Sequence, residues 1–471
     1  MESINLTLTS LNLTHDVLTK EHELLLFLDR SGNLADFRHV YILHREEKHT
    51  FYLNNGYYPP FNFAVQIDPE ILFELSGDLG VLFVTEVEHF RSVLIQTLNN
   101  YLRFLTLEDN VENEDEHCDY KEDLEVWIEL LSDYFPDPNF SFQRQHKNSI
   151  SLQKLTGSLI YLTAPKKYEK SRLFKCESRA CHYQRRVKHG RKPPSCILTG
   201  HPMIEVPRAT EVGEYMDARF LFEINRLPLT VRIPLKISKL QWTLGCRYNV
   251  VFQFDVHLSM YSAWYVSEAV PDLKPFLSSL PESIQNLRAE LENQCAQSPW
   301  TLVNYMSAEL CSNVTPRGVF HNLKMGLLLS LASMRCNAGK PVPLLCLGPE
   351  NTTLIREASI LSHHLIDMTA NPSNQQGCVE GIFSDELQAG PLQIARDGIC
   401  YVGEWSKYGH GKHSPASKIL KALEDGYIST TNQGKTHLCQ LKCLVWATLY
   451  WVPNNKASSN QQSSSLKVIL E

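Results

Sequence analysis

Four residues with metal-ligand chemistry form two close pairs near the middle of the chain. They are Cys176, Cys181, Cys196 and His201. Four residues separate the members of each pair, and fourteen residues separate the pairs. Two such pairs, each forming a knuckle and joined by a loop, can enclose a tetrahedral structural zinc ion. His182 and His189 are also within reach, and ordinary core cysteines are the alternative. The spacing therefore predicts a zinc site whose ligand identities stay open.

A cluster of positive charge surrounds these pairs. Between Lys166 and Lys192 there are eleven Lys or Arg residues and only two Glu. Such a cluster attracts phosphate backbones, with an affinity that falls as salt rises, so it predicts contacts with DNA. A solvated basic loop is the alternative. The candidate DNA-binding residues are Arg185, Arg186, Lys188, Arg191 and Lys192.

A second candidate site follows the apolar stretch Ile399–Val402, which predicts a buried strand. It carries Gly403 and Glu404 to its carboxyl end, where open α/β sheets place their ligand crevices. The surrounding stretch, 389–405, resembles the Walker B segment of the MCM family of replicative helicase ATPases, A-G-A-L-V-L-A-D-x-G-I-C-C-I-D-E-F. In a P-loop ATPase an Asp helps to hold the magnesium water shell and the next Glu polarises water. Gly403 stands where the family has this Asp.

The family resemblance also implies a phosphate-binding loop after the predicted strand 342–347. Where MCM ATPases have G-D-P-G-T-A-K-S, this chain has Gly348, Pro349, Glu350, Asn351, Thr352, Thr353 and Leu354. Such a loop needs glycines to wrap the phosphates, a lysine to neutralise them and a hydroxyl on the metal. No lysine occurs between Lys340 and Lys407, and Glu350 adds a negative charge. We therefore expect neither ATP nor magnesium to bind.

Three further segments carry the resemblance. Residues 313–329 resemble the lead-in S-I-A-P-x-I-Y-G-H-x-x-V-K-K-A-L-L-L, and their apolar end predicts a helix over 323–334. Residues 419–429 resemble L-x-E-A-M-E-Q-Q-T-I-S, a helix and the entrance to a hairpin. Residues 443–451 resemble C-S-V-L-A-A-A-N-P, which places Tyr450 at the asparagine that the family uses as a sensor. The resemblance therefore implies a third lost catalytic position.

The elements that carry these residues form several domains. The 471 residues correspond to about three domains. We expect a multidomain α+β and α/β protein with an N-terminal helical subdomain at 1–150 and an OB-fold barrel at 151–270. A zinc-ribbon-like insertion at 174–203, a linker at 271–312, a partial degenerate AAA+ (MCM) P-loop-type domain at 313–456 and a polar tail at 457–471 complete the scheme. The OB fold, the ribbon and the AAA+ domain are what the resemblance implies.

The first 150 residues contain three distinct patterns. Phe90, Val93, Leu94, Leu98 and Leu102 fall on one face of a predicted amphipathic helix, whereas 81–85 predicts a short strand. Residues 108–123 contain nine carboxylates and one lysine, which predicts a solvated loop. Binding of a metal or a partner is the alternative for this acidic loop.

The predicted barrel strands carry several aromatic residues. The apolar runs are 158–162, 220–224, 229–234 and 248–254. Trp242, Tyr248 and Phe252 are candidates for stacking on the bases of single-stranded DNA. The alternative is that these rings belong to the barrel core.

Composition and charge restrict the class of protein. A net charge of −7 and an apolar fraction of 43% are ordinary for a globular chain, and no run reaches the length of a membrane span. No secretory signal is apparent, and thirteen scattered cysteines suit a reducing compartment. We expect no membrane partner, and the resemblance implies a nuclear location.

The family resemblance implies a function, which composition alone cannot indicate. Divergent MCM-like proteins with damaged ATPase motifs are associated with meiotic homologous recombination and double-strand break repair. We therefore expect a pseudo-ATPase, not an enzyme, whose partners are single-stranded DNA or recombination intermediates and other recombination or MCM-like proteins. The alternative is an ATPase subunit of an MCM-like ring helicase that is active only with partner subunits. The chain stops before the family's arginine finger, second sensor and helical lid, so a form truncated at the C-terminus is expected.

Overall fold

A computed structural model describes most of the chain as two compact units. The first unit comprises 1–158, 162–242 and 247–269, and the second comprises 159–161, 243–246 and 270–471. Within them the structure describes 15–110, 124–134, 151–178, 181, 183–188, 194–222, 228–237, 241–256, 259–269, 281–294, 298–335, 340–348, 352–362, 365–369, 378–380, 386–408, 414–432 and 435–450. The predicted segments 1–150 and 151–270 share the first unit, apart from two short pieces of the barrel segment and residue 270. Segments 271–312 and 313–456 share the second.

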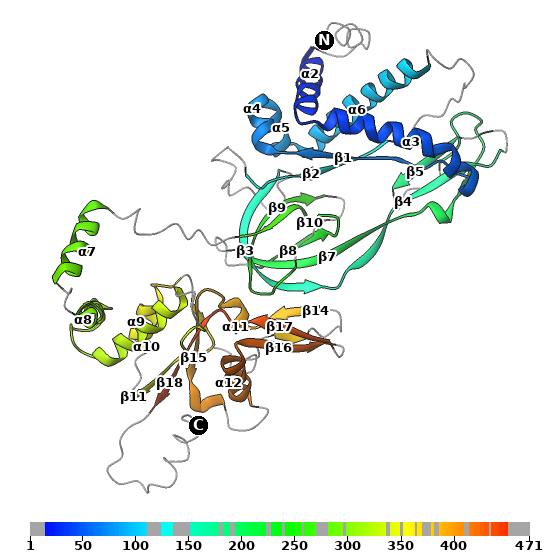
Figure 1. The fold of residues 1–471 in the computed structure, drawn as a ribbon. Helices are drawn as coiled ribbons and strands as arrows, with labels where there is room; N and C mark the ends of the chain where they lie inside the picture. Colours follow the sequence, from blue (N-terminus) through cyan, green and yellow to red (C-terminus); the bar gives the residue numbers. More distant parts are fainter. Residues whose placement is uncertain are drawn as a thin grey trace. The chain divides into compact units, whose positions relative to one another are not determined.

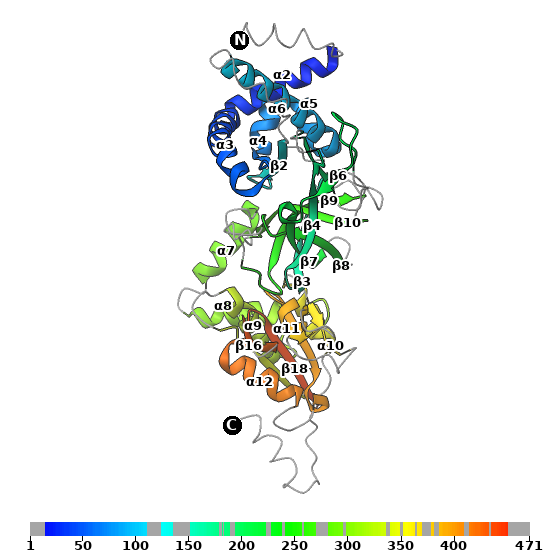
Figure 2. The same cartoon turned by 90° about the vertical axis from the view of Figure 1, so that its right-hand side faces the viewer.

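In the described part of the first unit, five helices pack around a short parallel sheet (Figure 2). The helices are α2 (His15–Arg30), α3 (Asn33–Asn55), α4 (Pro69–Leu75), α5 (Gly77–Thr85) and α6 (Val87–Asn110). The sheet pairs β1 (Phe61–Ile67) with β2 (Leu124–Leu130), and alternate residues of β1 are buried. Edge-to-face contacts of Phe37 with Phe61 and Phe63 fill the space between α3 and β1. The predicted amphipathic helix is confirmed as α6.

The prediction of a strand at 81–85 is wrong, because these residues form the second half of α5. The hydroxyl of Ser76 accepts a hydrogen bond from the N–H of Leu79 and so caps the helix. Leu79, Leu82 and Phe83 are buried, whereas Val81 is exposed, which is a helical and not an alternating pattern. A short apolar run cannot by itself distinguish a strand from a buried helix.

A closed barrel forms the rest of the first unit (Figure 1). Its strands run in the order β3 (Gln153–Thr163), β9 (Arg247–Asp255), β10 (Met260–Glu268), β8 (Pro228–Pro234) and β7 (Glu211–Phe222), and β3 also pairs with β7. β4 (Lys166–Cys176) continues from β7 and pairs with β5 (Gln184–Lys188) and β6 (Met203–Glu205). A short helix, η2 (Pro207–Ala209), links β6 to β7.

The barrel interior settles the role of two predicted stacking residues. Tyr248 and Phe252 are almost fully buried, and their rings contact Phe220 and Phe222. Both therefore belong to the core, as the alternative interpretation had it. Trp242 is half-buried with its ring 5.0 Å from that of Tyr248.

The second unit contains a four-stranded parallel sheet. Its order is β11 (Leu344–Gly348), β18 (Leu444–Tyr450), β15 (Ile399–Glu404) and β12 (Leu365–Asp367). Its helices are α7 (Glu282–Gln294), α8 (Pro299–Glu309), α9 (His321–Arg335), α10 (Thr352–Ser359), α11 (Pro391–Ile394), η5 (Trp405–Tyr408) and α12 (Pro415–Asp425). Two antiparallel pairs join β13 (Cys378–Glu380) to β14 (Glu386–Ala389) and β16 (Tyr427–Asn432) to β17 (Lys435–Gln440). The predicted helix at 323–334, the strands at 342–347 and 399–402, and the helix and hairpin after 419 are confirmed.

Both faces of this sheet are covered, as is usual for parallel sheets. Along β15, Ile399 and Tyr401 pack in one core with residues of α9 and α10, whereas Cys400 and Val402 pack in another with residues of α11 and α12. Figure 1 shows α9 and α10 on one side of β15 and α12 on the other. This three-layer arrangement brings the carboxyl ends of β11, β15 and β18 to one edge. Among the described helices, none combines the length and hydropathy needed to cross a membrane.

Candidate functional site: a thiol cluster and a sheet edge

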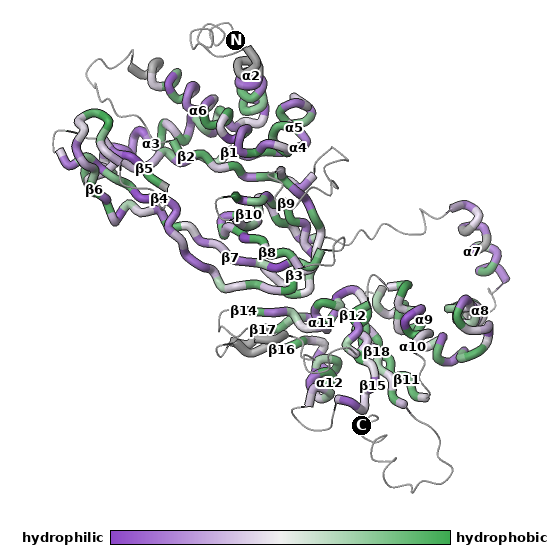
Figure 3. The backbone as a smooth tube through the Cα atoms, turned by 180° about the vertical axis from the view of Figure 1, so that it is seen from behind, coloured by the Kyte–Doolittle hydropathy of each residue, from purple (hydrophilic) through white to green (hydrophobic). Residues whose placement is uncertain are grey.

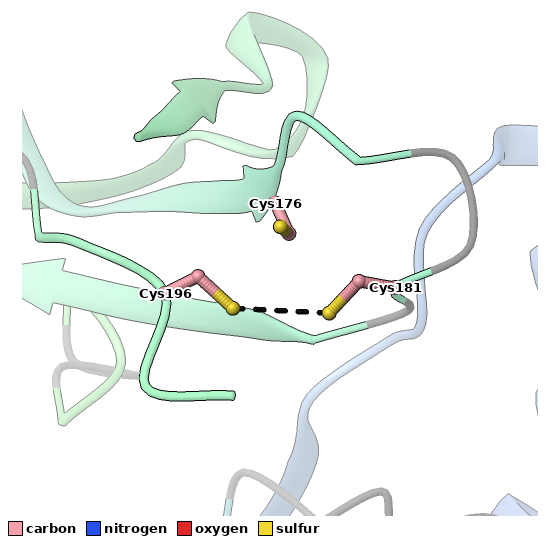
Figure 4. A group of neighbouring side chains, drawn as sticks. All are labelled: Cys176, Cys181 and Cys196. Carbon is pink, nitrogen blue, oxygen red and sulfur yellow. Dashed lines mark hydrogen bonds between the residues drawn. The ribbon is translucent and has the colours of Figure 1, made fainter. Parts of the chain in front are cut away.

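Three of the four predicted zinc ligands meet where β4, β5 and β6 adjoin. Cys176 ends β4, Cys181 precedes β5, and Cys196 lies in the turn before β6. Their sulfur atoms all lie within 4.8 Å of one another, and those of Cys181 and Cys196 are 3.7 Å apart (Figure 4). Pairing of β4 with both β5 and β6 sets this geometry. Three clustered thiols fit the ligand preference of zinc.

His201 lies outside this group. Its side chain is exposed, and its backbone carbonyl accepts a hydrogen bond of 2.9 Å from the N–H of Cys196. The same turn closes through the N–H of Gly200, which donates to the carbonyl of Cys196 at 2.9 Å. The described residues thus supply three thiol ligands, while His182 and His189 lie outside the described ranges.

The turn around Cys196 favours its thiolate form. Burial opposes ionisation, but hydrogen bonds from the hydroxyl and N–H of Thr199 and from the N–H of Leu198 lower the pKa of the Cys196 thiol to about 7. Because the thiolate is the form that binds metal, these donors prepare Cys196 for ligation near neutral pH. Phe174 and Met203 pack beside the sulfur atoms and limit access of water.

Most described cations of the basic stretch are paired with carboxylates. Lys170 lies 2.7 Å from Glu211, and Arg172 lies 2.6 Å from Glu169. Lys166 and Lys167 lie 3.7 Å and 3.6 Å from carboxylates of β7, Asp217 and Glu214 respectively. Much of the positive charge in this stretch is therefore neutralised within the fold.

Two of the predicted DNA-binding residues, Arg185 and Arg186, lie in different environments. The side chain of Arg186 is 9% exposed and lies 3.9 Å from Glu125 and 4.0 Å from Glu211. Arg185, its neighbour on β5, is exposed. The backbone of Lys188 belongs to β5, and Arg191 and Lys192 lie outside the described ranges. Arg185 is thus the described member of the set that presents its charge to solvent.

The ion pairs of Arg186 belong to a network of charged residues that the local sequence did not predict. Glu125 of β2 and Glu211 of β7 are brought together with Lys170 and Arg186. Burial and the charge of Glu211 raise the pKa of Glu125, and one of its buried oxygens has no hydrogen-bond partner. Burial also acts to raise the pKa of Glu211, but the hydrogen bond and charge of Lys170 outweigh burial and lower this pKa.

A cavity of about 480 Å³ between α6, β2 and β4 adjoins Glu125. Eighty-six positions separate the two carboxylates in the chain, so no short motif marks the network.

The positions predicted as remnants of an ATPase site also converge. In the parallel register Gly348 lies opposite Tyr450, and Glu404 lies opposite Thr448. The backbone N–H of Tyr450 donates to both carboxylate oxygens of Glu404, at 3.0 and 3.2 Å. The hydroxyl of Ser406 donates to the same carboxylate at 2.9 Å. Glu404 therefore ties β15 to the end of β18.

Gly403 occupies an irregularity in β15. The register with β18 shifts between Tyr401 and Gly403, and Gly403 has φ +84°, which non-glycine residues rarely adopt. A Cβ atom at Gly403 would lie 2.6 Å from Cγ2 of Thr369. The hydroxyl of Thr369 donates to Asp367 at 2.6 Å and fixes this methyl group. The backbone thus accommodates glycine at this position and opposes a larger residue.

The described residues after β11 begin at α10, which buries one of the positions predicted to lack a metal ligand. Leu354, aligned with a magnesium-binding serine, is 2% exposed and packs in the core beside Ile355 and Ala358. Thr352 begins α10, and Thr353 is exposed. Pro349 and Glu350 lie outside the described ranges. A leucine anchored in the core offers no oxygen to a metal.

Comparison with known proteins agrees with the resemblance. A family model described as "MCMDC2, N-terminal domain" matches residues 20–117. The chain is 20% identical over 456 residues to minichromosome maintenance domain-containing protein 2 of Rattus norvegicus, covering 87% of this chain and 63% of the relative. It is likewise 20% identical over 470 residues to the protein of that name from Mus musculus, covering 89% and 64%. The chain thus spans somewhat less than two thirds of these relatives. Together, these matches support a relationship of this chain to divergent MCM-domain-containing proteins.

Proposed function

We propose that this chain is a non-catalytic MCM-like protein that associates with DNA and acts as a scaffold. In this proposal the closed barrel is an OB fold, the β4–β6 extension is a zinc ribbon, and the parallel sheet with its helices is a degenerate AAA+ module. Such a protein would keep the family's shape for assembly and would not hydrolyse ATP.

One observation carries the proposal: Glu404 is a structural acceptor. A catalytic glutamate in this place must polarise water beside a metal and a phosphate chain. Here both carboxylate oxygens accept the N–H of Tyr450, and the preceding position is a glycine in a bulge. Leu354 in the core and the absence of lysine from 341–406 support the same conclusion.

DNA association rests on a smaller set of cations than the sequence suggested. Exposed Arg185 is the described candidate for a phosphate contact, and Lys188, Arg191 and Lys192 remain predictions. The thiol cluster supports the fold of this extension, because zinc held by Cys176, Cys181 and Cys196 would fix β4, β5 and β6 together. Bound zinc would supply this cross-link and no chemistry beyond it.

The biological setting follows from the family resemblance. We infer a nuclear protein of meiotic homologous recombination and double-strand break repair, whose partners are recombination or MCM-like proteins and single-stranded or branched DNA. The sheet edge and the barrel support the MCM-like architecture that this role requires.

Calorimetric titration with millimolar ATP, with and without magnesium, tests the proposal. We expect no binding heat in either condition. Magnesium-dependent binding would overturn the pseudo-ATPase assignment and favour the alternative, an ATPase subunit of a ring helicase. The same alternative would be favoured if ATP hydrolysis appeared only after MCM-like partner subunits were added and was lost in Glu404→Gln.

A further inference from the structure

The cavity beside Glu125 has walls from α6, β2 and β4 of the first unit. Its volume is about 480 Å³, within the range of roughly 300–1,000 Å³ that small-ligand pockets span. Helix α6 contributes Glu88, Arg91, Ser92 and Ile95, which recur every three or four residues and therefore share one face. Figure 3 shows both hydrophilic and hydrophobic residues along this helix, and the cavity receives both kinds.

One part of the cavity wall is apolar. Ile95 of α6 and Leu124 of β2 are half-buried and pack against the core of the first unit, and Val126 is buried in that core. Trp127 also lines the cavity, and its indole N–H donates to the carboxylate of Glu129 at 3.2 Å. The wall therefore offers the contact area that favours burial of a large apolar group.

One polar atom of the lining lacks a hydrogen bond. The Oε2 atom of Glu125 is buried, and among the described residues it has no hydrogen-bond partner. The Nζ atom of Lys170 lies 3.6 Å from it and donates instead to Glu211, at 2.7 Å. A buried acceptor without a donor has lost its hydration without compensation. A ligand that matches this cavity therefore brings a hydrogen-bond donor to Glu125.

The charges of the lining favour a neutral ligand. Its described residues include two carboxylates, Glu88 and Glu125, and two cations, Arg91 and Lys170. Because both signs are present in equal number, the wall as a whole favours neither an anion nor a cation. The cations can also attract the electron-rich face of an aromatic ring. Arg91 is held at the wall by β2, where it donates to the carbonyl of Val126 at 3.4 Å.

We propose that this cavity is a docking site for a tryptophan or tyrosine side chain of a partner protein. The ring would lie against Ile95, Leu124 and Val126, and its N–H or O–H would donate to Oε2 of Glu125. Each of these side chains joins a large apolar body to one hydrogen-bond donor, which are the two properties that the lining requires. Both are enriched among the residues that anchor protein interfaces. A nucleic acid would instead bring phosphate charge beside Glu88.

Fluorine NMR of ligand binding to the full chain tests the need for a donor. The matched probes are 5-fluoroindole and 1-methyl-5-fluoroindole, in which a methyl group replaces the donated hydrogen. We expect 5-fluoroindole to bind about tenfold more tightly, as for one hydrogen bond to a charged acceptor. In Glu125→Leu the two probes should bind equally, whereas Glu125→Gln keeps an acceptor oxygen and should retain most of the preference. Equal affinity of the natural chain for both probes would overturn the proposal.

Variants of α6 locate the bound probe without changing Glu125. Ser92→Trp introduces a ring at the cavity from an exposed position, so it should abolish binding of 5-fluoroindole and leave the melting temperature unchanged. His89→Trp alters an exposed neighbour outside the lining and should bind the probe as the natural chain does. Unchanged binding in Ser92→Trp would place the probe elsewhere and overturn the proposal.

Competition experiments identify the class of occupant. N-acetyltryptophanamide should displace 5-fluoroindole from the natural chain. N-acetylphenylalaninamide lacks a side-chain donor and should be about tenfold less effective. Displacement by a single-stranded oligonucleotide and not by N-acetyltryptophanamide would overturn the proposal, because the occupant would then be a nucleobase.

Discussion

The carboxylate of Glu404 accepts the backbone N–H of Tyr450 through both of its oxygens, at 3.0 and 3.2 Å. The family resemblance aligns these residues with the catalytic glutamate and the sensor asparagine of MCM ATPases. In this chain they hold the ends of β15 and β18 together.

Replacing Glu404 should affect stability and leave nucleotide chemistry unchanged. Glu404→Ala removes the acceptor for Tyr450 and Ser406, so the free energy of unfolding should fall by about 1 kcal/mol, at the low end for hydrogen bonds to charged groups because the site is partly exposed. Glu404→Gln keeps one acceptor oxygen and should lose about half as much. Urea unfolding measures both, with Glu424→Ala, at an exposed carboxylate on α12, as the control. A stability of Glu404→Ala equal to that of the control would contradict the structural role.

A side chain at Gly403 should destabilise the sheet through Thr369. Gly403→Ala must adopt a positive φ and displace a methyl group 2.6 Å away, at a cost of about 1–3 kcal/mol. Thr369→Ser removes that methyl group and retains the hydroxyl that donates to Asp367. In the double variant the steric part of the cost should disappear, whereas the cost of the positive φ should remain. A double-mutant cycle by urea unfolding measures this coupling, and strictly additive effects would argue against the contact.

The two carboxylates of the ionic network should respond to pH with opposite sign. Because the folded pKa of Glu211 is lowered, its ionised form contributes stability above its unfolded pKa, and this contribution is lost as pH falls through the folded pKa. Glu211→Gln should therefore destabilise the protein by about 1–2 kcal/mol at pH 7 and by less at pH 3. Thermal melts across this range measure the difference.

For Glu125 the folded pKa is raised, so its stabilising contribution is present at low pH and is lost as pH rises through the folded pKa. Glu125→Gln should consequently be neutral or stabilising at pH 7, and the advantage should vanish below the unfolded pKa of about 4.3. A marked loss of stability in Glu125→Gln at pH 7 would mean that its ion pairs with Lys170 and Arg186 dominate.

Substitutions of Arg185 and Arg186, neighbours on β5, should differ in their effects on DNA affinity and on thermal stability. Arg185→Gln should weaken binding of single-stranded DNA and reduce the slope of log affinity against log salt by about 1, as for the loss of one phosphate contact. Arg186→Gln should chiefly lower thermal stability, because its guanidinium is buried against Glu125 and Glu211. Fluorescence anisotropy at several salt concentrations separates the two outcomes. If Arg185→Gln and Arg186→Gln are both stably folded and lose the same affinity for single-stranded DNA, then Arg186 also belongs to the DNA-binding surface.

Zinc should depend on the three clustered thiols. The purified protein should contain about one zinc ion per chain, and Cys176→Ser and Cys196→Ser should lose most of it. Cys311→Ser changes a half-buried thiol of the second unit and should retain the metal. Chelation should lower the melting temperature of the natural chain more than that of Cys196→Ser. If the purified natural protein contains no zinc and chelation leaves its melting temperature unchanged, the three cysteines are core residues and not metal ligands.

The sequence predicted most elements that have a strong local pattern. The strands β11 and β15 and the helices α6 and α9 follow from their apolar patterns, and the spacing of Cys176, Cys181 and Cys196 anticipated their approach. The prediction failed at 81–85, where a short apolar run was compatible with either period. The pairing of Arg186 with Glu125 and Glu211 could not be predicted, because it depends on strands distant in the chain. The bulge at Gly403 is likewise a property of strand register and carries no local sign beyond glycine itself.

The bulge at Gly403 restricts which residues this position can hold. A single substitution that introduced aspartate at Gly403 would meet both an unfavourable backbone conformation and the methyl group of Thr369. An aspartate beside Glu404 would therefore require β15 to return to regular register and Thr369 to be replaced by a smaller residue. The packing of Thr369 against the bulge therefore works as a steric filter that restricts position 403 to glycine.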